Sequence, residues 1–446
     1  MNQVEISGIA AAGLGPDSRS RCERVLTLMH THRGDPLAEV ERLLADDPTC
    51  LSAHSLRAAL LVLADDDASR APLAASVAAI EAAGPELGGL DRRHAAAARA
   101  WIEADPLRAL DRYAAIVVDY PRDILALLVA HALDFRLGKQ RMLRDRVARV
   151  LPEWDATDPG YASVLAMHAF GLEENGQYRL AEKTARRALM LDPGHPGAIH
   201  VVAHVMEMQG RARDGLAWLA ETAWAWTEGT GFSVHLAWHR GLFQLDLGDA
   251  KAALATYDTQ IACADLCAMP ALVDASALLW RLELRGADTG ARWAALARRW
   301  DAQSLHGVRA FYLVHAMMAF VGAGWNAECA RVMDLLHRAS AEATSTSSAN
   351  AALATPLCEA LVAFGRRRYA ACVEHLTRVR HLAQRCGGSV AQCDLIHLTM
   401  TEAALRARQT RLAHALVTER TAQKPASRLN RLLLERALTL VAASPA

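Results

Sequence analysis

Apolar residues recur three and four positions apart along most of the chain, with charged and polar residues between them. On an α-helix this spacing places the apolar side chains on one face, which then needs a partner to cover it. Alanine and leucine dominate and β-branched residues are sparse, as is typical of helix-forming sequences. The pattern predicts an all-α protein in which amphipathic helices stack against one another.

A repeat becomes visible when the chain is compared with itself. In residues 161–193, YASVLAMHAFGLEENGQYRLAEKTARRALMLDP, small and turn-forming residues mark the frame: Ala169, Gly176, Ala181, Ala188 and Pro193. This segment resembles a tetratricopeptide repeat, a pair of helices of about 34 residues whose contact positions are small. We therefore expect a tetratricopeptide-like α-solenoid, a right-handed superhelix of about ten to twelve antiparallel helix pairs.

With Ala162 as its first position, the same frame starts again at four other places: Leu90, Ile124, Pro196 and Val234. We expect residues 90–260 to form the best-defined repeats of one continuous array. Residues 1–89 are predicted to form an N-terminal helical cap of uncertain register, and residues 261–446 to form degenerate repeats with a C-terminal cap. Two polar segments, DDDASRAP from Asp65 and SAEATSTSSAN from Ser340, are predicted connections.

Charge, cysteine content and the absence of long apolar runs limit the classes of function and the cell compartment that we expect. Lysine plus arginine equals aspartate plus glutamate at 49 each, so no net field attracts nucleic acid or an anionic membrane. The nine cysteines include no CxxC pair, and only Cys263 and Cys267 stand one turn apart, which argues against a disulfide framework. We see neither a signal peptide nor a membrane span. These features predict a cytoplasmic protein, and they leave open whether it forms a homo-oligomer.

Two histidine pairs with helical spacing fall in the array. The segment HVVAHVMEM carries His200, His204 and Glu207, and the segment HLAWH, one repeat later, carries His235 and His239. Residues four and seven apart project from the same face of a helix. In the repeat frame, most of these side chains occupy positions that face the concave surface. The sequence therefore predicts a groove or pocket lined by histidine and glutamate.

Imidazoles from two helices with a carboxylate beside them match the donor sets of Zn, Fe or Mn sites. We predict four metal ligands: His200, His204, His235 and His239. Glu207 and Glu173 are predicted as further ligands, or as the general base for a metal-activated water. Five more residues are predicted to contact a bound ligand: His94, Glu174, Trp238, Asp246 and His315. Since His-lined grooves also bind carboxylates without a metal, the metal-free alternative stays open.

Structural roles compete with some of these assignments. Trp218, Trp224, Trp226 and Trp238 gather around the two histidine-bearing repeats, where they would brace helix packing as readily as they would line a ligand site. No GxxxxGK[ST], GxGxxG, HExxH or GxSxG motif is present. Nucleotide binding, zincin chemistry and nucleophile-elbow hydrolysis therefore have no support.

The order of four segments is more specific than the repeat consensus. HAFGLEE is followed by HVVAHVMEM, then by HLAWHRGLFQLDLGD, and later by LVHAMMAFVGAG. This arrangement resembles the tetratricopeptide repeat protein 38 family over roughly residues 91–417. The resemblance implies an all-helical array whose histidines face inward, and it implies no particular activity.

Two functions are consistent with these observations. The first is a binding protein that holds a small molecule or an acidic peptide in a His- and Glu-lined concave groove. The second is a metal-dependent enzyme that acts on a small molecule by hydrolysis or oxidation at the histidine cluster. Peptide-binding repeats usually carry lysine and arginine at groove positions. Histidine and glutamate at these positions therefore favour a catalytic or metal-binding role more strongly than the fold by itself would suggest.

Overall fold

A computed structural model describes the chain over residues 15–84, 89–263, 268–303, 305, 309–341 and 346–442. The chain divides into two compact units. Unit 1 comprises Met1–Val202 and Trp224–Phe232, and unit 2 comprises Ala203–Ala223 and Ser233–Ala446. This division differs from the predicted boundaries at residues 89/90 and 260/261, which stay a prediction about the repeats.

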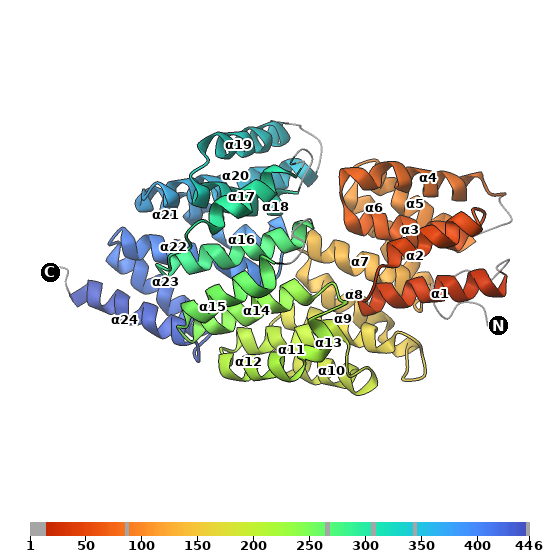
Figure 1. Cartoon of the computed structure of the whole chain (residues 1–446), viewed down its shortest axis with the longest axis horizontal. Coiled ribbons are helices and arrows are strands. Elements are labelled where there is room, and N and C mark those ends of the chain that lie inside the picture. Colours follow the sequence, from red (N-terminus) through yellow and green to blue (C-terminus); the bar gives the residue numbers. More distant parts are fainter. Residues whose placement is uncertain are drawn as a thin grey trace. The chain divides into compact units, whose positions relative to one another are not determined.

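Unit 1 is built from helices that follow one another along the chain (Figure 1). They are α1 (Pro16–Thr31), α2 (Pro36–Asp46), α3 (Leu51–Ala64), η1 (Asp67–Ser69), α4 (Arg70–Ala82), α5 (Gly89–Ile102), α6 (Pro106–Asp119), α7 (Ile124–Arg136), α8 (Gln140–Val150), η2 (Leu151–Glu153), α9 (Tyr161–Glu174) and α10 (Tyr178–Leu191). Helix α11 (Pro196–Met208) runs unbroken across the division, and most of α13 (Ala223–Trp226) belongs to unit 1.

Unit 2 continues the helical pattern to the C-terminal end of the described chain. Its helices are α12 (Ala212–Glu221), α14 (Ser233–Asp246), α15 (Ala250–Thr256), η3 (Tyr257–Ile261), α16 (Met269–Leu284), α17 (Arg292–Asp301), α18 (Ala310–Ala323), α19 (Asn326–Ala341), α20 (Thr346–Gly365), α21 (Tyr369–Val379), η4 (Arg380–Cys386), α22 (Val390–Arg406), α23 (Thr410–Gln423) and α24 (Arg428–Ala442). Among the described residues, β-type pairing is limited to one isolated antiparallel bridge, between Arg33 and Thr230.

The helices form the pairs that the repeat frame predicts. The five predicted repeat starts, Leu90, Ile124, Ala162, Pro196 and Val234, each fall within one residue of the first residue of α5, α7, α9, α11 or α14. Many successive helices pack against one another, as in α5 with α6 and α9 with α10. The prediction of an all-α, tetratricopeptide-like α-solenoid is therefore confirmed.

Small residues stand where helices approach most closely. A Cβ added to Gly171 of α9 would lie 2.4 Å from the backbone oxygen of Leu143 in α8, and one added to Gly215 of α12 would lie 2.2 Å from Cζ of Phe243 in α14. Neither position has room for a side chain, so glycine is what lets these helices pack this closely. Gly176, predicted at the turn between α9 and α10, has φ of 74°, a value that favours glycine.

Several helices begin where the sequence carries a start signal. At α2 and α6 an aspartate precedes a proline, and the Asp35 carboxylate accepts a hydrogen bond from the backbone N–H of Ala38 at 3.0 Å. Asp105 accepts one from Arg108 N–H at 2.9 Å in the same way. The proline costs nothing at this position, because the first N–H groups of a helix have no partner inside it.

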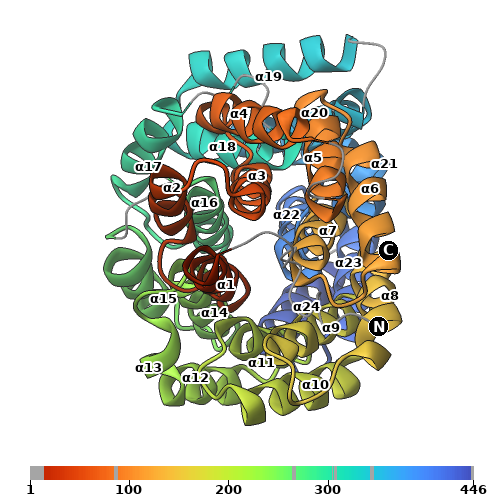
Figure 2. The ribbon, with the colours of Figure 1, turned by 90° about the vertical axis from the view of Figure 1, so that its right-hand side faces the viewer.

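Unit 2 curves back on itself. Helix α16 contacts α22, and α14 contacts α24, although these pairs are far apart in the sequence. Two hydrogen bonds connect α16 to α22, from Trp280 Nε1 to Thr399 Oγ1 at 3.0 Å and from Arg281 Nη2 to the carbonyl oxygen of Ala391 at 2.9 Å. In Figure 2 the helices of unit 2 can be followed by colour from α14 through α18 to α24. The late helices therefore cover part of the surface of the early ones.

The two polar segments behave differently. The segment from Asp65 is a connection as predicted, since η1 links α3 to α4 there. The loop predicted from Ser340 is wrong at both described ends, because α19 extends to Ala341 and α20 already begins at Thr346. Serine and threonine are favoured at helix starts, so a polar run can also open a helix.

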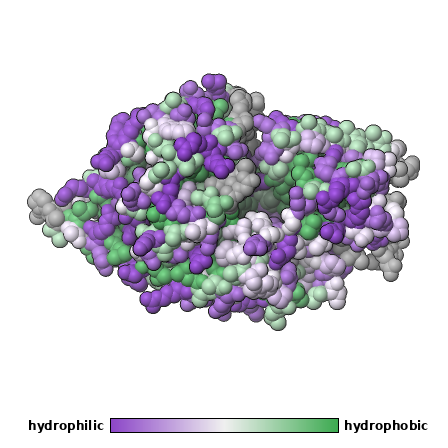
Figure 3. All heavy atoms as spheres, in the orientation of Figure 1, coloured by the Kyte–Doolittle hydropathy of each residue, from purple (hydrophilic) through white to green (hydrophobic). Residues whose placement is uncertain are grey.

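On the face shown in Figure 3, polar side chains cover most of the surface and apolar ones lie between them. No described helix has both the length and the apolar character that a bilayer crossing requires. The described cysteines are free thiols, and Cys267 lies outside the described residues.

Candidate metal centre

Three histidines of unit 2 come together from two helices. His204 lies on α11, and His235 and His239 lie one turn apart on α14. The ring centroids of His204 and His239 are 4.5 Å apart, and those of His235 and His239 are 4.9 Å apart. The rings meet edge to face, so they converge without stacking.

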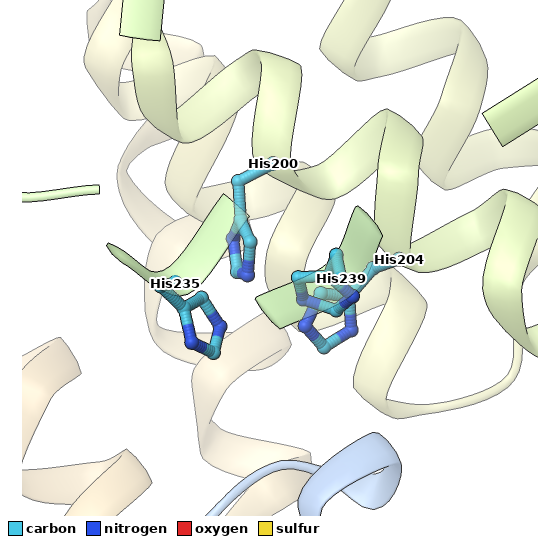
Figure 4. Close-up of side chains that lie close together, drawn as sticks. All are labelled: His200, His204, His235 and His239. Atoms are coloured by element: carbon cyan, nitrogen blue, oxygen red, sulfur yellow. The ribbon is translucent and has the colours of Figure 1, made fainter. Parts of the chain in front are cut away.

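His200 stands one turn before His204 on the same continuous helix. Each of the four histidines offers a ring nitrogen, and these nitrogens all lie within 4.8 Å of one another (Figure 4). Ligand nitrogens around a tetrahedral zinc ion lie about 3.4 Å apart, given a Zn–N bond of about 2.1 Å. Side-chain rotations that shorten these separations by an ångström or so would complete a metal site. We call these four residues the histidine cluster.

The histidine cluster is shielded from water on most sides. His204 and His239 have no exposed surface, and His200 is 7% exposed. The side chain of His235 retains 21% exposure, which makes it the member nearest to solvent. A buried imidazole is a useful metal ligand because the neutral ring carries no charge that burial would penalise.

Asp274 on α16 orients one of the rings. Its Oδ2 lies 2.9 Å from Nδ1 of His235, and the residue is 2% exposed. Because an ionised carboxylate can only accept, Nδ1 of His235 is the donor in this hydrogen bond. Histidines that bind metals typically donate their second nitrogen in this way.

Asp274 is absent from the residues predicted by sequence. It is the one acid in the apolar run PALVDASALLW, and a buried acid in such a run is the signal that could have identified it. Its Oδ1 has no hydrogen-bond partner within the described part of the chain. This leaves an acceptor for a water molecule or for an N–H donor near the histidines.

Trp238 packs against the histidine cluster. Its ring stacks on His235, with 5.2 Å between centroids and 15° between planes, and it meets the edge of His239 at 4.8 Å. Because Trp238 is fully buried, these contacts brace the two histidines. Trp224, by contrast, is 70% exposed and supports no core. The predicted ligand contact of Trp238 stays a prediction.

Glu207 does not belong to the histidine cluster. Its Oε1 lies 2.5 Å from Nζ of Lys424, a residue of the segment between α23 and α24. Burial lowers the pKa of Lys424, but the attraction of Glu207 and Asp394 outweighs this and raises it. The ammonium group of Lys424 therefore stays charged and forms an ion pair with the carboxylate that was predicted as a metal ligand or general base. Its other oxygen, Oε2, has no hydrogen-bond partner among the described residues, so the predicted role as ligand or base stays a prediction.

Three other predicted site residues are buried in unit 1. Glu173 and Glu174 are buried on α9 of unit 1. His94, also in unit 1, has Nε2 2.8 Å from Oδ2 of Asp123, whose attraction outweighs burial and raises the pKa of His94. Their predicted roles in binding or catalysis stay predictions.

In unit 2, Asp246 accepts hydrogen bonds from Ser427 Oγ and from the backbone N–H of Arg428. Nδ1 of His315 lies 2.8 Å from the carbonyl oxygen of Phe311 on the same helix, and burial lowers the pKa of His315 to about 4. Both side chains thus have local structural partners, and their predicted contacts with a ligand stay predictions.

Comparison with known proteins adds no assigned activity. No family model matches the chain. A chain in the crystal structure of the APC/C hetero-tetramer Cut9-Hcn1 is similar at 12% identity and a TM-score of 0.46, over 94% of this chain and 72% of that one. The human IFIT1 dimer with PPP-AAAA is similar at 12% identity and a TM-score of 0.38, over 97% of this chain and 96% of that one. The assignment as a tetratricopeptide-like helical repeat rests on the helix pairs of the chain itself, and membership in the tetratricopeptide repeat protein 38 family stays a prediction.

Proposed function

We propose that this protein binds a divalent transition-metal ion through His204, His235 and His239, with His200 as a fourth nitrogen donor. The observation that supports this most directly is the convergence of four ring nitrogens within 4.8 Å. The hydrogen bond between His235 and Asp274 supports it independently, because histidines that bind metals typically donate their second ring nitrogen to a carboxylate.

The donor set favours some metals over others. Imidazole nitrogens suit zinc, copper, nickel and iron, whereas manganese prefers carboxylate and water ligands. The four side chains of the histidine cluster all offer nitrogen donors. Of the three metals considered from sequence, Zn²⁺ and Fe²⁺ therefore fit better than Mn²⁺.

The number of histidines that bind decides what the metal could do. Four protein ligands close a tetrahedral zinc site, and such sites are structural. Three ligands leave a position open for water, whose pKa zinc lowers to about 7, so that hydrolysis becomes accessible. His200 is the variable ligand, since it is the member of the cluster that stands outside unit 2.

The first experiment is metal analysis by mass spectrometry of the full chain purified without a His-tag. We expect about one metal ion per chain in the wild type and none in a variant with His204→Ala and His239→Ala together. His337→Ala, an exposed histidine on α19, is the matched control and should keep the metal. Absence of metal in the wild type, also after incubation with zinc or ferrous iron, would refute the proposal.

That negative result would favour the metal-free alternative, a His-lined groove for a small carboxylated molecule or an acidic peptide. If metal is present, His200→Ala separates the two kinds of site. Retention of metal with a cobalt spectrum that responds to added anions would indicate an open position. Loss of metal would indicate a closed, structural site.

A further inference from the structure

A cavity lined by charged side chains lies within unit 2. It has a volume of about 50 Å³ and is bordered by residues of α14 and α16 on one side and of α22, α23 and the start of α24 on the other. A water molecule needs about 10–15 Å³ on the same measure, so the space suits a few waters or one small polar group. None of the four histidines lines it.

The acidic residues that line this cavity already have partners. Glu207 binds Lys424, and Asp394 accepts two hydrogen bonds from Arg420 at 2.7 and 3.2 Å. Asp246 is held by the hydrogen bonds described above. The cavity is lined by four basic side chains and these three carboxylates, so one positive charge is in excess.

The excess charge falls on two arginines of α16. Arg281 and Arg285 stand one turn apart, and neither forms an ion pair with any described residue. Arg281 is 4% exposed and is positioned by hydrogen bonds from Nη1 to the carbonyl oxygen of Ala277 and from Nη2 to that of Ala391. Since a guanidinium group has five N–H donors, several remain for a ligand. Burial lowers the pKa of both arginines, as expected when water is removed and no carboxylate fully replaces it.

Apolar side chains complete the lining. Leu242 and Leu245 of α14 and Leu398 of α22 border the same space as the two arginines. A ligand that fits both parts has one negative group and a short hydrocarbon chain. The planar fork of an arginine matches the two oxygens of a carboxylate.

We propose that Arg281 and Arg285 bind the carboxylate of a short aliphatic monocarboxylic acid in this cavity. A monoanion balances the single excess charge, and the alkyl chain contacts the leucines. The site is independent of the histidine cluster, although the Arg281 guanidinium lies over the ring of Trp238, 5.3 Å from its centroid.

The test is thermal unfolding of the full chain at increasing propionate, with sodium chloride at matched ionic strength as the reference. We expect a saturable rise in Tm with propionate beyond that with chloride. Arg285→Gln should need about tenfold more propionate, because a charge-assisted hydrogen bond to the anion is lost. Arg285 is half-buried and has no ion pair to break, so this variant should fold.

Two further variants make the result specific. Arg299→Gln removes an exposed arginine of α17 and should leave the propionate dependence unchanged. Arg285→Lys keeps the positive charge but lacks the planar guanidinium group, and it should bind propionate with intermediate affinity. This variant tests the site even if Arg285→Gln is unstable. Each titration is run with EDTA and with zinc. Binding in both conditions separates this site from the proposed metal.

Three results would overturn the inference. The first is a Tm that rises no more with propionate than with chloride. The second is an equal response of wild type and the Arg285 variants. The third is stabilisation by inorganic phosphate at lower concentration than by propionate, which would assign the arginines to a phosphate group.

Discussion

Replacement of Asp274 tests whether the histidine cluster is a metal site or a packing feature. Asp274→Asn keeps an oxygen that can accept from Nδ1 of His235 but removes the negative charge, and Asp274→Ala removes both. Loss of such a supporting hydrogen bond typically lowers metal affinity by about 10- to 100-fold. The 2.9 Å hydrogen bond is largely buried, so little water is available to replace the lost partner.

We therefore expect Zn²⁺ affinity to fall about tenfold in Asp274→Asn, equivalent to about 1.4 kcal/mol, and closer to a hundredfold in Asp274→Ala. The dissociation constants are measured by competition with a zinc-chelating dye near neutral pH, and circular dichroism verifies the fold. Asp301→Asn, which breaks a surface ion pair with Arg331, is the control and should bind zinc as the wild type does. Equal affinity in all four proteins would refute the assignment of Asp274 as a positioning residue.

Three further outcomes follow from the structure. Zinc at about a hundred times its dissociation constant should stabilise the wild type by about 2.7 kcal/mol in thermal unfolding, and should not stabilise the double histidine variant. Burial lowers the pKa of His30 to about 4 and of His195 to about 3, so the stability from their neutral forms is present above pH 6.5 and is lost as the pH falls. Urea denaturation should show a loss of about 1.6 kcal/mol per histidine between pH 6.5 and 5, and His30→Gln should weaken that dependence. Gly215→Ala should destabilise the fold by about 1–3 kcal/mol, because its Cβ would overlap Phe243; an unchanged denaturation midpoint would contradict this.

The sequence predicts the helix pairs well because their determinants are local. Pro196 begins α11 as the repeat frame requires, and Gly176 forms its turn through a backbone conformation that suits glycine. The spacing of His235 and His239 predicts a shared helix face for the same reason. Polar content alone does not separate loops from helix starts, as Thr346 at the beginning of α20 shows.

Partners that come from distant segments could not be predicted in the same way. Asp274 binds His235 across 39 residues, and Lys424 binds Glu207 across 217 residues. The first contact joins α14 to the neighbouring α16, and the second depends on how unit 2 curves back on itself. No local pattern encodes either partner. At the site, Glu207, which was predicted as a metal ligand, has Lys424 as its partner, and Asp274, which was not predicted, supports His235.

The contacts between the early and late helices of unit 2 also determine how it unfolds. In an open solenoid each repeat contacts only its neighbours, so the ends can fray while the middle stays folded. In unit 2, detachment of α24 would expose α14, and loss of the Lys424 segment would leave the charge of Glu207 buried without a cation. Removal of the terminal helix should therefore weaken the whole unit and not one repeat. Because such long-range contacts slow the search for the native state, unit 2 should fold more slowly than a linear array of the same length and unfold in a single cooperative step.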